Sequence, residues 1–171
     1  MTTFASTPML DRAWIAAHIP HAGAMCVLDR VDAWDDVRIR CSATSHHDPN
    51  NPLRAGGRLA SVCGIEYAAQ AMAVHGALLG AQHAQAEPAR PRAGYLASVR
   101  NVDAFVDRLD TFELPLTVDA ERIGGDDRSV LYGFALRCGE RVLLSGRAAV
   151  MLDASAAGAF VPPPAGCADP R

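Results

Sequence analysis

The sequence contains no lysine, although it has sixteen arginines among its 171 residues. Any site for an anionic group must therefore use arginine, whose planar guanidinium group suits phosphate. The basic residues form no block and the net charge is −3, so the electrostatic footprint of a nucleic-acid-binding protein is missing. We expect no nucleic-acid partner.

Paired cysteine motifs are also missing. The five cysteines are odd in number and include no Cys-x-x-Cys pair, which indicates reduced thiols rather than a disulfide framework. A zinc site needs clustered Cys and His ligands. His46, His47 and Asp48 are adjacent, but neighbouring side chains on an extended chain diverge, and we expect no metal.

Long hydrophobic runs are missing as well. The longest run of low polarity, residues 68–81, contains Gln70 and His75 and is too short to cross a bilayer. The first ten residues have neither a basic region nor a long apolar core, unlike a signal peptide. We therefore expect a cytoplasmic protein with no membrane partner.

What the chain does contain is enough apolar sequence for one domain with a buried core. Ser61, whose hydroxyl is expected to cap, begins a helix that extends to about residue 81, with an apolar stripe. We expect that stripe at Ile65, Ala68, Ala69, Met72 and Leu79. A shorter helix is expected at 8–17, and strands at 37–44, 94–102, 114–123, 129–138 and 141–152, with 25–31 either a strand or the end of a loop.

This order of elements predicts an α+β domain over residues 1–153, with one long helix packed in the concavity of a curved antiparallel sheet. Glycine-containing turns at 124–127 and 138–140 favour hairpins. Such a sheet leaves an open edge strand, which pairing with a second chain would cover. Residues 154–171 are rich in Ala, Gly and Pro and predict a disordered or loosely packed tail.

Candidate chemistry is concentrated between residues 46 and 70. His46 and His47 precede a Pro-rich turn, and Glu66 lies near the start of the apolar helix. An imidazole and a carboxyl group are the usual equipment for moving protons near neutral pH. Taken alone, these residues are more typical of solvated turn histidines and of a glutamate that stabilises the helix dipole.

Four short motifs change that balance, because they occur in a characteristic order. They are Ile19-Pro20-His21, Asp29-Arg30-Val31, His47-Asp48-Pro49-Asn50-Asn51-Pro52 and Glu66-Tyr67-Ala68-Ala69-Gln70. Together they resemble the hotdog-fold, FabZ-like 3-hydroxyacyl-(acyl carrier protein) dehydratases. The resemblance is nearer to the ApeP branch, which is associated with aryl polyene clusters, and extends to about residue 152. That branch is matched by Asn51-Pro52-Leu53-Arg54, Gly57-Arg58-Leu59, the run 64–76 and Gly94-Tyr95-Leu96-Ala97.

The resemblance implies a hotdog fold and the loss of water from a 3-hydroxyacyl thioester, giving a trans-2-enoyl thioester in aryl polyene or related fatty-acid-like biosynthesis. It implies that a histidine is the base and that Glu66 handles the hydroxyl group, the two meeting across a dimer interface. Either His46 or His47 fits, with a slight preference for His46. No cofactor is implied, since the substrate is carried on the 4′-phosphopantetheine of an acyl carrier protein. Further candidates are Gln70 to orient Glu66; Ser61, Gly64, Tyr67 and Tyr95 to bind substrate; and Arg54 and Arg58 to contact phosphate.

Two departures from the FabZ-like pattern keep other functions open. The spacing between the histidine and Glu66 is longer, and Leu59-Ala60-Ser61 replaces the usual Pro-Gly. Ser61 or a neighbour must then donate the backbone N–H that polarises the thioester carbonyl. One alternative is a hotdog thioesterase in which Glu66 activates water. Another is a non-catalytic subunit that completes the site of a separate FabZ-like dehydratase, forming a heteromer instead of a homodimer or higher homo-oligomer.

Overall fold

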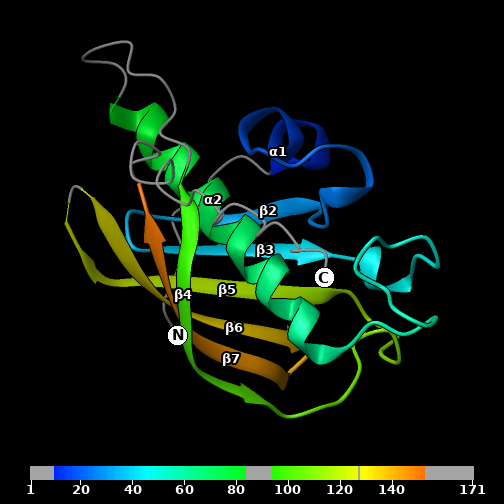
Figure 1. Cartoon of the computed structure of the whole chain (residues 1–171). Helices are drawn as coiled ribbons and strands as arrows, with labels where there is room; N and C mark the ends of the chain where they lie inside the picture. The colour runs from blue at the N-terminus through cyan, green and yellow to red at the C-terminus, as the bar shows by residue number, and fades with distance from the viewer. Residues whose placement is uncertain (1–9, 84–93, 127, 153–171) are drawn as a thin grey trace, which may run out of the picture.

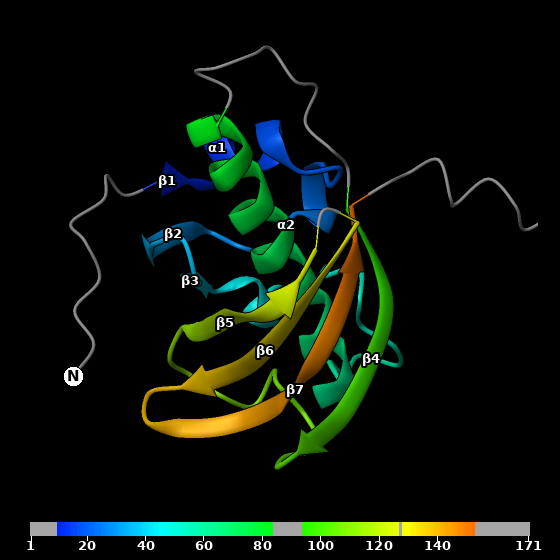
Figure 2. The ribbon, with the colours of Figure 1, turned by 90° about the vertical axis from the view of Figure 1, so that its left-hand side faces the viewer.

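A single antiparallel sheet organises the chain, and the computed structural model describes residues 10–83, 94–126 and 128–152. The sheet order is β1-β2-β3-β5-β6-β7-β4, and the sheet curves strongly (Figures 1 and 2). The strands are β1 (Leu10–Asp11), β2 (Arg30–Trp34), β3 (Arg38–Ala43), β4 (Tyr95–Ala104), β5 (Leu116–Gly125), β6 (Ser129–Cys138) and β7 (Arg141–Met151).

One long helix, α2 (Gly64–His83), fills the concave side of this sheet (Figure 2). It packs against β3, β5 and β6 and follows directly on a 3₁₀ turn, η3 (Ser61–Cys63). A short helix, α1 (Arg12–His18), begins after Asp11, whose carboxylate caps it by accepting from the N–H of Trp14 at 2.9 Å. The arrangement is the hotdog fold, as the sequence predicts.

Most predicted strands are confirmed to within a few residues, but the segment 25–31 is mainly a loop. It follows a 3₁₀ turn, η1 (Gly23–Met25), and only its last two residues enter β2. Both predicted hairpins are present, between β5 and β6 and between β6 and β7. Gly125 and Gly139 have φ angles of +144° and +57° in these turns, which side chains disfavour.

The buried face of α2 differs from the predicted stripe. Ala68 and Met72 are buried, but Ile65, Ala69 and Leu79 are partly exposed. The other buried positions are Gly64, Tyr67, Gln70, Ala71, Val74, His75 and Leu78. Apolar residues occur on every side of this helix, so their spacing alone does not reveal which side faces the sheet.

The continuous helical segment is longer than the predicted apolar run. Ser61–Gln82 has 22 residues and a mean hydropathy of 1.2, which would allow it to span a membrane by length and composition. The prediction concerns residues 68–81 alone, and the helix as a whole extends beyond that run. However, 56% of the most apolar window is buried within the domain, which is the environment of a core helix.

Several predictions concern residues at the edges of the described ranges. The domain limit at residue 153 and the tail 154–171 lie outside the described residues and stay predictions.

Four of the cysteines are described, and all four are free thiols. Burial raises the pKa of the Cys26, Cys41 and Cys63 thiols, so they are poor nucleophiles at neutral pH.

Gly64 is needed where the start of α2 approaches the sheet. A Cβ at this position would lie 2.8 Å from methyl groups of both Leu136 and Leu144, which are fully buried. We expect Gly64→Ala to lower the free energy of unfolding by about 1–2 kcal/mol, because overpacking outweighs the gain in helix propensity. Gly76→Ala is the matched control, since open space surrounds Gly76 in the same helix and the substitution is expected to stabilise. Urea unfolding measures both, and equal effects would contradict this packing role.

Candidate active site

Glu66 lies in the first turn of α2 and is held through one of its two carboxylate oxygens. Oε1 accepts from Gln70 Nε2 at 2.8 Å and contacts His21 Nε2 at 3.0 Å. No described residue makes a hydrogen bond or ion pair to Oε2. About 29% of the Glu66 side chain is exposed. The carboxyl group is thus anchored on one oxygen and available on the other.

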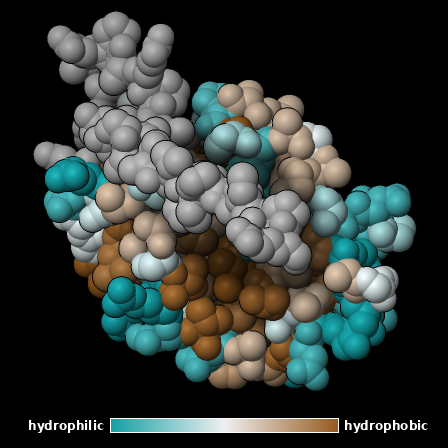
Figure 3. Space-filling model, viewed as in Figure 1, coloured by the Kyte–Doolittle hydropathy of each residue, from teal (hydrophilic) through white to brown (hydrophobic). Residues whose placement is uncertain are grey.

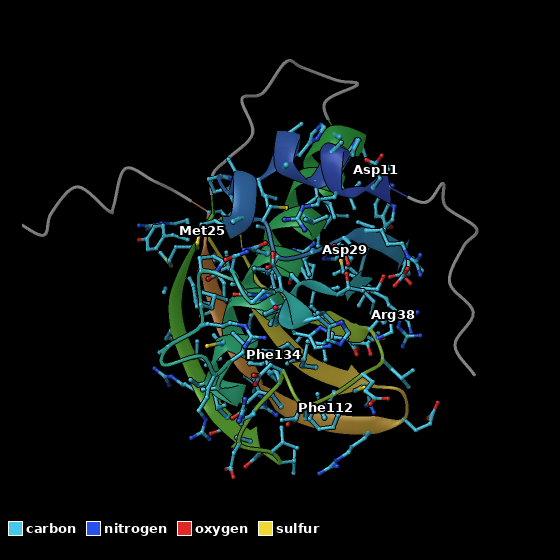
Figure 4. The ribbon with its side chains drawn as sticks, turned by 90° about the vertical axis from the view of Figure 1, so that its right-hand side faces the viewer. Asp11, Met25, Asp29, Arg38, Phe112 and Phe134 are labelled. Atoms are coloured by element: carbon cyan, nitrogen blue, oxygen red, sulfur yellow. The ribbon has the colours of Figure 1, made fainter. Side chains whose placement is uncertain are left out.

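Gln70 connects Glu66 to the loop before β2. Its side chain is fully buried, donates to the carbonyl of Met25 at 2.7 Å and accepts from the N–H of Val27 at 2.9 Å. This loop carries the residues from Met25 to Asp29 alongside α2 (Figure 4). The hydrogen bond from Gln70 to Glu66 agrees with the prediction that Gln70 orients Glu66. A role of Gln70 in binding substrate stays a prediction.

His46 and His47 lie in a 3₁₀ turn, Ser45–His47, rather than on an extended strand. Both Nε2 atoms contact the carbonyl oxygen of Phe112, at 3.1 Å and 2.7 Å, in the segment between β4 and β5 (Phe112 is labelled in Figure 4). The ring centroids are 3.8 Å apart. The expectation that the two side chains diverge is therefore wrong, because both rings turn toward the same carbonyl oxygen, that of Phe112.

Burial separates the two histidines. The His46 side chain is completely buried and that of His47 is exposed. Burial lowers the pKa of His46 below its ordinary value near 6.5, and nearby His47 acts in the same direction. A carbonyl oxygen only accepts hydrogen bonds, so a neutral His46 ring carries its proton on Nε2. Its Nδ1 is buried without a hydrogen-bond partner among the described residues.

Arg54 fixes the turn that carries the histidines. It donates from Nη2 to the carbonyl of His46 at 2.9 Å and from Nε to that of Asp48 at 2.8 Å. It also pairs with the nearly buried Asp110 at 3.1 Å. The side chain of Arg54 is only 14% exposed, so its guanidinium group is committed to the protein and the predicted phosphate contact at this residue is wrong. Arg58 lies exposed on the same loop.

A chain of hydrogen bonds joins the histidine turn to α2 beside Glu66. Asn51 Nδ2 donates to the Tyr67 hydroxyl at 3.1 Å, and the hydroxyls of Tyr67 and Ser45 are 2.9 Å apart. Ser45 in turn donates to the carbonyl of Val27 at 2.7 Å, and the N–H of Val27 donates to Gln70. The supports of the two candidate catalytic groups are therefore parts of one network.

Replacing Tyr67 by phenylalanine tests this network. Tyr67 is fully buried, and the substitution leaves Asn51 and Ser45 without their shared partner. We expect the free energy of unfolding to fall by about 1–3 kcal/mol, the cost of unsatisfied buried polar groups. Tyr95→Phe is the control, since Tyr95 is partly exposed at the start of β4. Chemical denaturation with the same loss for both variants would argue against the network.

Tyr95 is not brought to the helix start within one chain. It begins β4, whose other end is followed by Asp107, and the carbonyl of Asp107 accepts from the N–H of Ser61 at 3.0 Å. A ten-residue strand is about 30 Å long, so Tyr95 and the start of α2 mark opposite ends of β4. Its contact with substrate stays a prediction.

The backbone N–H groups at the helix start differ in whether they already have an acceptor. Ser61 donates to Asp107, Cys63 donates to Ala60 at 3.0 Å, and Gly64 donates within the turn. The N–H of Val62 has no acceptor among the described residues, and its side chain is 59% exposed. Ser61 does not cap the helix, because Ala60 occupies the cap position without a side-chain bond. The sequence alone cannot show that the N–H of Ser61 is already bonded to Asp107, so it cannot indicate that the neighbouring N–H of Val62 is the one without an acceptor among the described residues.

No group of three or more His, Cys, Asp or Glu side chains that could hold a metal ion occurs in the described ranges. The site offers instead an anchored carboxyl group, a buried neutral imidazole and a free backbone N–H at a helix start. Within the described residues, no hydrogen bond or ion pair joins Glu66 to His46 or His47. His21, which the sequence analysis gives only as part of the Ile19-Pro20-His21 motif, is the histidine that contacts Glu66.

A curved antiparallel sheet around one helix defines a hotdog-fold protein. A model of the ApeP-like dehydratase family matches residues 13–160, and the chain belongs to this family. No curated protein matches the sequence.

Solved structures share the fold at low sequence identity. A chain of the dehydratase heterocomplex ApeI:P from Xenorhabdus doucetiae is 22% identical, with a TM-score of 0.70 over 83% of this chain and 92% of that one. A mutant of the thioesterase PA1618 from Pseudomonas aeruginosa is 14% identical, with a TM-score of 0.53 over 88% and 97%. The PaaI protein from E. coli is 11% identical, with a TM-score of 0.53 over 71% and 80%.

Proposed function

We propose that the protein is a 3-hydroxyacyl-(acyl carrier protein) dehydratase that forms trans-2-enoyl thioesters in aryl polyene or related fatty-acid-like biosynthesis. Family membership supports the reaction class. The observation that carries the proposal is that the chain holds both a carboxyl group anchored on one oxygen, Glu66, and a buried imidazole, His46, whose Nδ1 is unpartnered among the described residues. Elimination of water needs one such acid and one such base.

The proposed reaction assigns one step to each group. His46 Nδ1 removes a proton from C2 of the acyl chain, and the electrons of that C–H bond form the C2=C3 double bond. The C3–O bond breaks as Glu66 Oε2 protonates the departing hydroxyl group, which leaves as water. The N–H of Val62 donates to the thioester oxygen, where negative charge develops. A proton returned from His46 to Glu66 through solvent resets the site.

The site is proposed to form between two hotdog chains. Glu66 does not contact His46 or His47 within the described chain, so a second chain would supply the missing partner. β4 is the last strand of the sheet and exposes Leu96 and Val102, with Phe105 following. An unpaired apolar edge invites strand pairing. Figure 3 shows an apolar area on the face that β4 crosses in Figure 1.

The second chain is proposed to be another copy of this one, in a homodimer. A heteromer with a second dehydratase subunit is the alternative, prompted by the heterocomplex to which the similar ApeI:P chain belongs. Light scattering after gel filtration gives the mass of the purified protein. Twice the chain mass of 18.1 kDa is expected, whereas a monomer that becomes active only with a second dehydratase would favour the heteromer.

Mass spectrometry of a 3-hydroxyacyl group on an acyl carrier protein tests the reaction directly. The expected product has lost one water and remains attached to the 4′-phosphopantetheine arm. A thioesterase, the function of fold neighbours such as PA1618, would release the carrier protein with its free arm. Release of the acyl group without an enoyl product would contradict the dehydratase proposal, and no reaction at all would favour a non-catalytic subunit.

Proline at position 62 tests the proposed backbone donor. The first turn of a helix tolerates proline, and Val62→Pro removes the one N–H at the helix start that lacks an acceptor among the described residues. We expect kcat to fall about 10²–10³-fold, the usual effect of losing an oxyanion donor. Val62→Ala keeps the N–H and should retain activity. Similar activity for the two folded variants would exclude this donor.

A further inference from the structure

His21 has no part in the reaction as described, although it is the histidine in contact with Glu66. Its Nε2 lies 3.0 Å from Glu66 Oε1, and about a quarter of its side chain, 26%, is exposed. The other ring nitrogen, Nδ1, is buried and has no partner among the described residues. Among the described residues, Glu66 is therefore the one polar partner of the His21 ring.

The contact defines which oxygen of Glu66 can carry a proton. An ionised carboxylate oxygen only accepts, so the His21 proton must reside on Nε2 for this contact to form. Gln70 Nε2 donates to the same oxygen at 2.8 Å. With two donors directed at Oε1, the proton of a neutral Glu66 belongs on Oε2, the oxygen without a partner among the described residues.

The segment that carries His21 is held by the same glutamine. Gln70 binds the carbonyl of Met25 and the N–H of Val27, and Arg12 donates to the carbonyl of Gly23 at 3.3 Å. The loop between α1 and β2 is thereby fixed at both ends of η1. His21 lies just before η1, so its ring is presented to Glu66 by a constrained backbone.

We propose, building on the dehydratase function above, that His21 is a positioning residue for Glu66. Together with Gln70 it immobilises Oε1, so that Oε2 faces the departing hydroxyl group with the proton in place. A single partly exposed contact between an imidazole and a carboxyl group contributes little to folding stability. The effect of losing His21 therefore falls on the rate of the chemical step rather than on the melting temperature.

The kinetic test compares two single substitutions at His21 in the full-length, assembled protein. His21→Ala is expected to lower kcat about 10- to 100-fold, because a misplaced acid costs rate, with KM within about twofold. His21→Gln should regain most of the loss, since its amide N–H can replace Nε2–H. His18→Ala is the matched control, because His18 is exposed and its ring nitrogen contacts the carbonyl of Trp14. Unchanged kcat in His21→Ala, or a His21→Gln variant as slow as His21→Ala, would overturn the positioning role.

A spectroscopic measurement tests the contact between His21 and Glu66 without relying on dehydratase activity. Long-range ¹H–¹⁵N spectra of the imidazoles identify which ring nitrogen is protonated in the neutral form. His21 is expected as the Nε2–H tautomer in the wild type, and this preference should weaken in Glu66→Ala. The Nδ1–H tautomer in the wild type would overturn the proposal. The expected tautomer in a protein without dehydratase activity would support the contact and contradict the proposed function.

Discussion

Replacing Glu66 by glutamine is expected to lower the kcat of dehydration about 10²–10⁴-fold, the usual contribution of a general acid. Glutamine has nearly the same shape, and its amide oxygen can still accept from His21 and Gln70. It offers no acidic proton at the position of Oε2. The fold and its melting temperature should therefore be retained while the chemistry is lost.

Glu121→Gln is the matched control for that measurement. Glu121 is an exposed carboxylate on β5 and pairs in register with Arg38 and Gly133. Its loss should leave kcat unchanged within about twofold, as expected for a surface change far from the reacting atoms. Retention of more than about a tenth of the wild-type kcat by Glu66→Gln, well above the range for a lost general acid, would remove Glu66 from the reaction.

Glutamine at position 46 is expected to lower kcat about 10²–10⁴-fold, whereas glutamine at position 47 should change it less than about threefold. The amide N–H of glutamine can still donate to the carbonyl of Phe112, so the turn keeps its main contact. What His46→Gln removes is the basic Nδ1, which is buried and unpartnered among the described residues. His47 is exposed, and its loss leaves that nitrogen intact.

Steady-state rates of the two variants decide between the histidines, with circular dichroism to confirm folding. The reverse ranking, with His47→Gln inactive and His46→Gln active, would assign the base to His47. Full activity of both variants alongside an inactive Glu66→Gln would contradict the dehydratase mechanism, because water activation by Glu66 alone describes a thioesterase.

The pH dependence of kcat/KM also tests whether His46 is the base. His46 acts as a base only when neutral, so activity is lost as the pH falls through its pKa. Burial lowers that pKa from 6.5, and the acidic limb of kcat/KM is therefore expected to have its midpoint below 6.5. Measurement of kcat/KM across the acidic range tests this, and a midpoint above that value would exclude a desolvated His46 as the base.

Much of the fold is predictable from short-range patterns in the sequence. Turn residues such as Gly125 and Gly139 locate the hairpins because their positive φ angles favour glycine. The rotation of α2 is not predictable, since apolar residues surround it and only the shape of the sheet selects the buried side. The loop at 25–31 is apolar because Val27 and Leu28 are buried, although only the last residues of the segment join the sheet.

The site is predictable in its residue types and not in its contacts. Glu66 and the two histidines are marked by their motifs, but the attachment of Glu66 to His21 joins segments far apart in the chain. The close approach of the His46 and His47 rings depends on their shared contact with the carbonyl oxygen of Phe112, which lies far along the chain. Likewise, Arg54 is indistinguishable from a phosphate ligand until its bonds to His46 and Asp110 are known.

Mixing two inactive variants tests most directly whether the site is built from two chains. His46→Gln and Glu66→Gln homodimers are each expected to be inactive, but subunit exchange produces mixed dimers with one intact site. Random exchange should restore about a quarter of the wild-type rate, because half of the dimers are mixed and each has one of its two sites intact. A mixture that stays as inactive as its components, after exchange is verified by mass spectrometry, would contradict a site shared between chains.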